Sequence, residues 1–267
     1  LLRADKIGYR NLQIIGQNVT FILRDITQEA GAKAALRTLF QTNVNLSAGQ
    51  GRIAYTDAEW TRLMKLAQSQ TVEVLRTRVD AFGVSEPLIQ QQGEDRVLVQ
   101  LPGIDDVQRA KDVIGKTAQL TFHLVQENPS ASTLTLFEAG FPLYVTARPS
   151  LTGEMLTQAG ASFDEFNQPV VDISFNSRGT RLFAKLSTDN VGRRFAIVLD
   201  GEVLSAPVFR EAILGGRAQI SGDFTVESSQ DLSTLLNAGA LPAPVSVVEE
   251  RTVGPSLGAD SVAAGQL

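Results

Sequence analysis

The fold of this chain is decided by the run Thr77-Arg-Val-Asp-Ala-Phe-Gly-Val-Ser-Glu-Pro87, which stands at the end of a long helical pattern. Apolar residues recur at intervals of three and four through 58–82, which places them on one face of a helix. We expect Asp57 to cap this helix at its start, Gly83 to end it, and Pro87 to prevent its continuation.

The run is followed directly by the stretch Leu88-Ile-Gln-Gln-Gln-Gly-Glu-Asp-Arg-Val-Leu-Val-Gln-Leu-Pro-Gly103. The elements expected from here are, in order, a hairpin with strands at 88–92 and 96–101, a helix at about 105–114 and a strand at 118–124. A capped helix at about 226–238 and a strand at 244–251 would complete a split-βαβ layer. The sequence therefore predicts an α+β protein with a ferredoxin-like base.

The chain between these two halves, about 126–223, is expected to form an inserted α+β head with its own core. It contains a predicted strand at 169–175, a helix at 177–188 and a hairpin that turns at Asp200-Gly201, a dipeptide suited to a tight turn. Gly215-Gly216-Arg217 indicates another turn, since no Gly-Lys-Ser/Thr follows to make a phosphate loop.

The first residues predict a small N-terminal α+β unit beside the base. Strands at 9–15, 18–24 and 52–56 surround a helix that Thr27 caps and that runs to about Phe40. The first strands of this unit are expected to lie before residue 1. The sequence thus predicts five segments. They are the N-terminal unit at 1–57, the first part of the base at 58–125, the inserted head at 126–223, the second part of the base at 224–254 and a connecting segment at 255–267.

Composition argues against several classes of function. The 267 residues include 29 acids and 24 bases, a net charge of −5 that is unfavourable for nucleic-acid binding. Cysteine is absent, which excludes disulfides and thiolate metal sites. No stretch approaches the roughly 18–20 apolar residues that cross a bilayer, and Leu1-Leu-Arg lacks the pattern of a signal peptide. We therefore expect a soluble domain.

The residues that could perform chemistry are better explained by structural roles. His123 is the only histidine. It alternates with Phe122 and Leu124 along the strand, so it is expected on the face opposite Phe122, at a surface or interface. A role as a general base is disfavoured, because such a base needs a positioned partner. Asp105-Asp106 fits a helix start, Glu249-Glu250 would alternate across a strand, and Asp164-Glu165 reads as a solvated loop. We expect no catalytic, metal-binding or cofactor-binding residue, and no enzymatic activity.

Three long motifs in the same order resemble the SecD family, a membrane subunit of the bacterial protein-export machinery. They are the run from Thr77 to Gly103, Leu235-Leu-Asn-Ala-Gly-Ala-Leu-Pro-Ala-Pro244, and Glu249-Glu-Arg-Thr-Val-Gly-Pro-Ser-Leu-Gly258. The last resembles the segment just before the second transmembrane helix of SecD, and Gly254, Gly258 and Gly265 would suit that approach to the membrane. The resemblance is strongest over about 66–125 and 190–262 and weakest over 126–165.

The resemblance implies the extracytoplasmic domain between the first two transmembrane helices of a bacterial inner-membrane protein. SecD works with SecF beside the SecYEG channel and helps to draw preproteins outward with the proton-motive force. The proton-carrying groups of the family lie in membrane helices that are absent from these 267 residues, so binding and movement are the expected contributions of this domain.

An apolar stretch from Leu134 to Tyr144 is the candidate surface for unfolded preprotein. Its large side chains either pack onto the head or line a partly exposed groove that accepts unfolded chains. The candidate residues are Leu134, Leu136, Phe137, Phe141, Leu143 and Tyr144.

Two polar segments are candidate hinges for a moving head. They comprise Gln126, Asn128 and Pro129 at one crossing and Gly222 and Asp223 at the other. The alternative is a static interaction domain that only assembles SecD with SecF or accessory factors. Exposed, mobile apolar surface on the head favours the first hypothesis, and a rigid head with a polar face favours the second.

Overall fold

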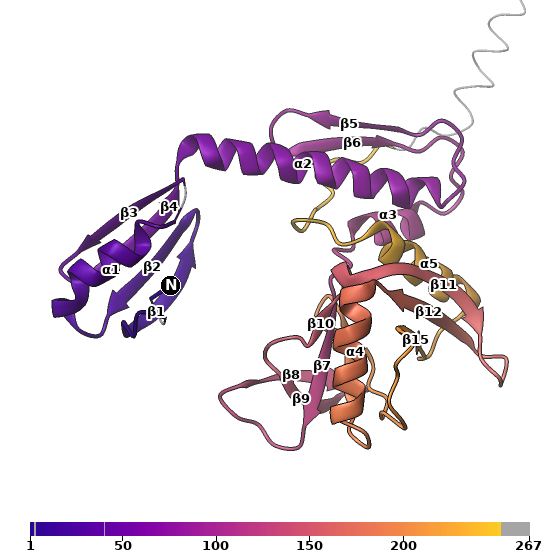
Figure 1. The fold of residues 1–267 in the computed structure, drawn as a ribbon. Coiled ribbons are helices and arrows are strands. Elements are labelled where there is room, and N and C mark those ends of the chain that lie inside the picture. The colour runs from indigo at the N-terminus through magenta and orange to yellow at the C-terminus, as the bar shows by residue number, and fades with distance from the viewer. Residues whose placement is uncertain (3, 40, 252–267) are drawn as a thin grey trace, which may run out of the picture. The chain divides into compact units, whose positions relative to one another are not determined.

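The structure is a computed structural model that describes residues 1–2, 4–39 and 41–251 of the chain (Figure 1). These residues form two compact units. One comprises 1–69 with 91–97, and the other comprises 70–90 with 98–251. Helices and strands are mixed throughout, so the predicted α+β class is confirmed.

The first unit is built on a four-stranded antiparallel sheet with the order β1-β2-β4-β3. Its elements are β1 (Tyr9–Ile15), β2 (Asn18–Leu23), the 3-10 turn η1 (Ile26–Gln28), α1 (Glu29–Leu36), β3 (Thr42–Ser47) and β4 (Gln50–Tyr55). Phe21, Leu23 and Leu46 pack under α1 in its core. Gly51 faces Phe21 across the β2–β4 pair, where an added Cβ would lie 2.1 Å from the ring, so only glycine fits there.

Most of this unit lies where the sequence predicts it, but its first helix starts at a different residue and β3 was not predicted. Asp25 rather than Thr27 caps the first turn, because its carboxylate accepts the Thr27 N–H at 2.9 Å. Similarly, Thr56 rather than Asp57 precedes the long helix α2 (Asp57–Asp80): its hydroxyl accepts from Glu59 N–H at 3.3 Å. β3 escaped prediction because Asn43, Val44, Asn45 and Leu46 alternate over only a few residues.

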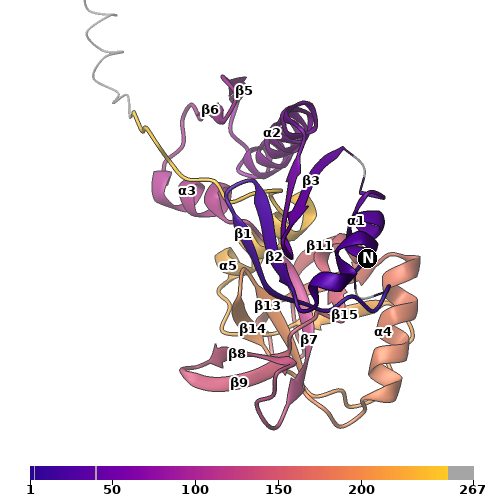
Figure 2. The same cartoon turned by 90° about the vertical axis from the view of Figure 1, so that its left-hand side faces the viewer.

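Two sheets form the main part of the second unit (Figure 2). The larger has the order β14-β13-β7-β9-β8 with β10 also on β7, and the smaller has the order β11-β12-β15. The strands are β7 (Leu120–Gln126), β8 (Thr133–Glu138), β9 (Phe141–Thr146), β10 (Leu151–Thr152), β11 (Leu156–Phe163), β12 (Pro169–Phe175), β13 (Phe195–Leu199), β14 (Glu202–Ser205) and β15 (Arg217–Ile220). The 3-10 turn η2 (Gly153–Met155) joins β10 to β11.

Three helices complete the second unit together with the C-terminal part of α2: α3 (Val107–Gly115), α4 (Ser177–Asp189) and α5 (Val226–Ala238). One continuous core joins both sheets to all three helices, from Val113 of α3 through Phe122 of β7 and Phe183 of α4 to Leu235 of α5. A cluster of phenylalanine rings lies at its centre, with the Phe195 and Phe209 centroids 4.8 Å apart.

Several predicted elements are confirmed within this unit. β12, α4 and α5 lie where the sequence placed them, and the turn at Asp200-Gly201 joins β13 to β14 with positive φ at both residues, 51° and 86°. The turn at Gly215-Gly216 is also present, with Gly216 at φ +66° immediately before β15.

The expected assembly of the base differs from the structure. The strand predicted at 244–251 does not form, and β5 (Leu88–Gln92) and β6 (Arg96–Gln100) pair only with each other. α5 packs on β11 and β12, inside the region assigned to the head, because its apolar face contributes Leu232, Leu235 and Leu236 to the common core. The prediction that 226–251 would instead complete a layer with 58–125 is therefore wrong.

Candidate functional site

The side chain of Arg78 lies between segments of the second unit that are far apart in the sequence. It is fully buried, and its guanidinium donates to the carbonyl oxygens of Val113 and Ile114, each at 3.0 Å, and of Lys116. It also donates to Thr117 at 3.4 Å and Gly239 at 3.1 Å. The last carbonyls of a helix lack partners within the helix, so Arg78 satisfies those at the end of α3.

Two chain segments cross beside this guanidinium and are bonded to each other. Leu241 N–H donates to Thr117 O at 2.8 Å, so residues 116–119 and 239–241 run side by side. Asp200 holds the first segment from the other side, since its carboxylate accepts Ala118 N–H at 2.9 Å and Gln119 N–H at 2.8 Å. We call the two segments and Arg78 the neck.

Burial has a clear electrostatic consequence at the neck. Desolvation lowers the pKa of Arg78 from its ordinary value to about 10, while the charge of Asp200 acts in the opposite direction. The group remains a cation at neutral pH, and its hydrogen bonds to backbone carbonyls compensate part of the cost of burying it.

α5 is attached to the smaller sheet by a pair of hydrogen bonds from one side chain. Asn237 donates through Nδ2 to Ala159 O at 2.8 Å and accepts Ala159 N–H through Oδ1 at 2.7 Å. The amide thus pairs with β11, the edge strand of its sheet, in the way a neighbouring strand would.

Arg109 joins α3 to α5 outside the neck. Its guanidinium contacts Asp231 at 2.7 Å and Glu227 at 2.7 Å, and these carboxylates raise the pKa of Arg109. The same guanidinium lies 5.8 Å from the Phe82 ring centroid. Arg109 thereby connects the end of α2 to α3 and α5.

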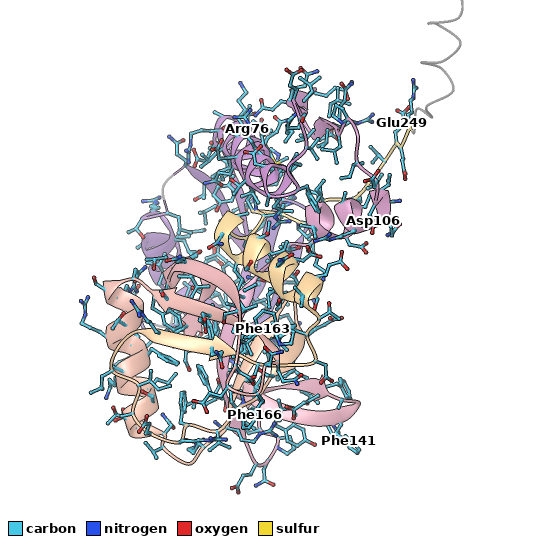
Figure 3. The ribbon with its side chains drawn as sticks, turned by 90° about the vertical axis from the view of Figure 1, so that its right-hand side faces the viewer. Arg76, Asp106, Phe141, Phe163, Phe166 and Glu249 are labelled. Atoms are coloured by element: carbon cyan, nitrogen blue, oxygen red, sulfur yellow. The ribbon has the colours of Figure 1, made fainter. Side chains whose placement is uncertain are left out.

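The candidate preprotein-binding residues lie on the β8–β9 hairpin and divide into two groups. Leu143 is buried and Leu136 is partly buried, and both pack with Val145 and Ala196 inside the curled larger sheet. Leu134, Phe137 and Phe141 are exposed by 46%, 64% and 75%, and Tyr144 is half-buried. Figure 3 labels Phe141 beside the hairpin end. Part of the stretch therefore packs into the head and part of it is exposed, and its role as a surface for unfolded preprotein stays a prediction.

Glu138 anchors the end of this hairpin. Arg194 Nη2 contacts both Glu138 carboxylate oxygens, at 2.7 and 2.6 Å, and Arg194 Nε donates to Ala206 O at 3.0 Å. The neighbouring Phe137 and Phe141 therefore stay exposed on a hairpin end that is fixed to β13 and the segment after β14.

His123 is buried, which corrects the expectation of a surface or interface position. It lies opposite Ala196 in the β7–β13 pair, and its Nδ1 lies 2.7 Å from Thr146 O. The face was predicted correctly as the one opposite Phe122. However, β8 comes close to β14, so the sheet curls around that face and covers it.

The acid pairs have structural or solvated positions. Asp106 caps α3 by accepting Arg109 N–H at 2.9 Å, as predicted, and Asp164 accepts the N–H groups of Phe166 and Gln168 in the β11–β12 turn. Glu250 meets Lys111 at 3.1 Å but does not lie on a strand, which corrects that expectation. In the described part of the chain, no group of His, Asp and Glu side chains is arranged to hold a metal ion.

Two family models match most of the second unit. The model described as the SecDF P1 head subdomain matches 130–243, and the N-terminal part of the P1 domain of protein translocase subunit SecDF matches 68–127. A solved structure of SecDF, described as a membrane component that enhances protein export, is 36% identical with a TM-score of 0.60 and covers 70% of this chain and 93% of its own. The chain belongs to the SecD/SecDF family.

Other relatives agree with this assignment. The SecD subunits of Rickettsia bellii and Magnetococcus marinus are each 42% identical over 99% of this chain. A SecDF crystal structure in a super-membrane-facing form is 37% identical, with a TM-score of 0.62 over 75% of this chain and 30% of its own. The chain spans about half the length of the two SecD subunits, 54% and 55%.

Membership in the SecD family confirms the resemblance seen in the sequence and assigns the chain to a family of protein translocation. SecD and SecDF are membrane proteins, although none of the described helices is long and apolar enough to cross a bilayer. Gly254, Gly258 and Gly265 lie outside the described residues.

The SecD head begins in the family model close to the predicted boundary at 126, but it continues through α5 to 243. Of the candidate hinge residues, Gln126 pairs with Tyr144 in the sheet, whereas Asn128 and Pro129 are exposed between β7 and β8. Gly222 and Asp223 are exposed between β15 and α5. Both segments thus join elements of the same unit, and their role as hinges stays a prediction.

Arg78 and Asn237 were not singled out from the sequence, although both lie within the SecD motifs. A signal was available for Arg78: it falls between Leu75 and Val79 on the buried face of α2, an unusual place for a cation. Asn237 likewise stands among the buried leucines of α5.

Proposed function

We propose that this domain assists protein translocation by holding emerging, unfolded preprotein on the exposed side chains of the β8–β9 hairpin. It would do so on the extracytoplasmic side of the bacterial inner membrane, with SecF and the SecYEG channel as partners of the full-length protein. We also propose that the domain acts without enzymatic chemistry and without a cofactor.

The observation that carries this proposal is the exposure of Leu134, Phe137 and Phe141 on one anchored hairpin. Strand pairing places Leu134 and Phe141 on one face of the hairpin and Phe137 on the other. A folded domain that exposes several large apolar side chains on one element offers contact to apolar partners. Such contact is worth about 25 cal/mol per Å² buried and requires no particular sequence in the partner. Holding would be weak and reversible, as is needed for a chain that must be passed on.

The proposal can be tested by changing only the exposed group. Replacing Leu134, Phe137 and Phe141 with serine in full-length SecD should reduce crosslinking to an arrested export intermediate by about tenfold, equivalent to about 1.4 kcal/mol. The matched control replaces Phe163, Phe166 and Val191, which are 54%, 80% and 52% exposed elsewhere on the same unit. Equal effects of the two triple variants would contradict a role specific to the hairpin.

Head movement is the second part of the proposal. We place its pivot at the neck, because residues 116–119 and 239–241 are the two segments that cross together beside Arg78. A rotation there would have to loosen the Arg78 hydrogen bonds and the contact of α3 with α5, and would leave the sheets intact.

The static alternative has its own supporting observation. Val113 of α3 and Leu235 of α5 belong to one continuous core, and Arg109 bridges the two helices on the outside. Cores of this kind resist continuous deformation. A domain held in this way would serve as a fixed scaffold that assembles SecD with SecF or accessory factors.

A crosslink between α3 and α5, beside the neck, distinguishes a moving head from a static scaffold. Arg109 and Asp231 can be replaced by cysteines in the full-length protein and joined with a short bifunctional reagent, with no background from this chain because it contains no cysteine. Loss of export on crosslinking, relative to the same unlinked variant, supports a moving head. Unchanged export supports the static scaffold.

A further inference from the structure

The first residues of the chain have the hydrogen-bond pattern that ends an α-helix. Leu1 O accepts from Ala4 N–H at 2.8 Å and from Asp5 N–H at 3.2 Å, the second with α-helical spacing, and Leu2 O accepts from Ile7 N–H at 2.8 Å. Lys6 lies between them with φ +57°, in the left-handed region. A left-handed residue followed by a six-to-one bond is the Schellman motif that closes a helix.

The sheet of the first unit has an apolar face that α1 covers only in part. α1 has eight residues, about 12 Å of helix, and lies over Phe21, Leu23 and Leu46. Strand pairing places Ile14, Val19 and Ile53 on the same face. Ile14 is nevertheless 80% exposed and Leu12 is 57% exposed.

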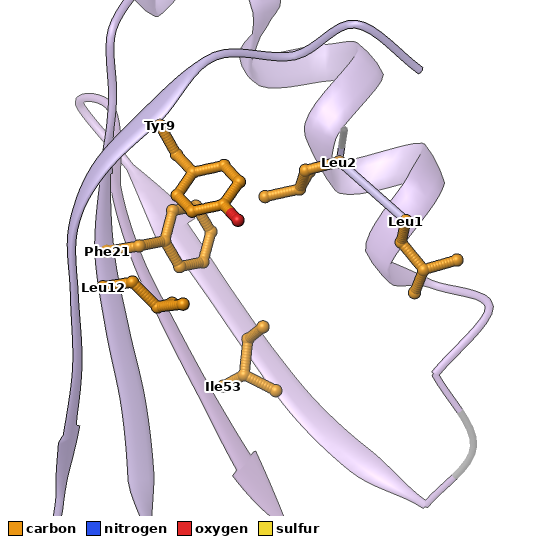
Figure 4. A pocket seen from close by; sticks show the side chains of 6 residues that line it. All are labelled: Leu1, Leu2, Tyr9, Leu12, Phe21 and Ile53. Atoms are coloured by element: carbon orange, nitrogen blue, oxygen red, sulfur yellow. The ribbon is translucent and has the colours of Figure 1, made fainter. Parts of the chain in front are cut away.

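A hollow lies on this face next to the helix end. It has a volume of about 200 Å³ and is lined by apolar or aromatic side chains, as Figure 4 shows: Leu1, Leu2, Tyr9, Leu12, Phe21 and Ile53. Leu1 and Leu2, which come from the helix end itself, form one side of it. The chain therefore enters the first unit beside the uncovered part of this face.

We propose that residues upstream of Leu1 in the full-length protein form an amphipathic helix that ends at Lys6 and covers this apolar face. The matched part is only 54% and 55% of the two SecD subunits, so these relatives have further residues outside it. Its apolar stripe continues from Leu1 and Leu2 at intervals of three and four residues and contacts Leu12, Ile14 and Ile53. The proposal replaces the expectation of strands before residue 1 and is independent of preprotein binding.

Cysteine crosslinking in full-length, membrane-embedded protein tests this arrangement. Leu12→Cys is combined with single cysteines at about eight consecutive positions upstream of Leu1, which cover two helical turns. The expected result is efficient disulfide formation within one molecule at positions spaced three to four residues apart. A period of two would show a strand, and disulfides between molecules would show a second copy on this face. Either result, or no crosslink at any position, overturns the proposal.

Neighbouring residues on opposite faces of β1 supply a matched pair of variants. Ile14→Asp places a charge on the covered face and should lower the crosslinking yield by about tenfold, because an apolar contact excludes an unpaired charge. Ile15, which pairs with Asn18 on the opposite face and is 58% exposed, should tolerate Ile15→Asp without loss of yield. Equal yields in the two variants would also overturn the proposal, and equal resistance of the two variants to limited proteolysis shows that both have folded.

Discussion

Arg78 Nη2 donates a hydrogen bond of 3.1 Å to the carbonyl oxygen of Gly239, a residue 161 positions away in the sequence. Arg78 belongs to the motif that ends α2, and Gly239 belongs to the motif that follows α5. One buried side chain thus joins the two most distinctive segments of the chain. Two of the three motifs that resemble SecD thus contribute residues to the neck.

Removing this guanidinium should unfold the neck. We expect Arg78→Leu to lower the free energy of unfolding by about 3–5 kcal/mol, because several buried carbonyls lose their donor at once. Arg78→Lys should cost less, since an ammonium retains the charge but cannot reach all of these carbonyls. The exposed Arg76→Ala on the same helix is the control and should change stability by less than about 0.5 kcal/mol. Urea unfolding followed by circular dichroism measures all three, and a loss below about 1 kcal/mol for Arg78→Leu would count against the neck.

Replacing Asn237 with aspartate tests its two hydrogen bonds, because the two side chains have nearly the same shape. Asn237→Asp keeps the acceptor for Ala159 N–H but replaces the donor to Ala159 O with a second acceptor. We expect a loss of about 2 kcal/mol in urea unfolding at neutral pH. Protonating the new carboxyl restores a donor, so lower pH should reduce the difference from wild type. A pH-independent difference would point to packing instead.

Stability measurements should separate the two groups of hairpin residues. Leu143 is 7% exposed and packs with Val145, so Leu143→Ser should cost about 2–4 kcal/mol. Phe137 and Phe141 are exposed, and serine at either position should change stability by less than about 0.5 kcal/mol. If Phe141→Ser proved as destabilising as Leu143→Ser, the exposed group would be part of the core and unsuitable for binding a partner.

Local elements were predictable from the sequence because their signals are local. The helical spacing through 58–82, the Asp200-Gly201 turn and the capping residue Thr225 each act over a few neighbouring residues. The pairing of β7 with β13 and the packing of α5 on β11 were not predictable in this way. They depend on contacts between segments far apart in sequence, which no periodicity encodes.

The candidate site shows the same division between local and distant information. The apolar stretch from Leu134 to Tyr144 was visible in the sequence, but which side chains face out depends on how β8 and β9 pair and on the curl of the sheet. For the same reason, alternation gave the correct face for His123 but not its burial.

Site-specific photo-crosslinking tests the central claim most directly. A photoreactive residue is placed at Phe141 or, as a control, at Phe166 of full-length SecD. These positions are 75% and 80% exposed, on the β8–β9 hairpin and in the β11–β12 turn, and Figure 1 shows the two strand pairs extending to different sides of α4. During export of an arrested preprotein, we predict strong crosslinks from Phe141 and weak ones from Phe166. Equal crosslinking at both positions, or none at Phe141, would contradict this prediction.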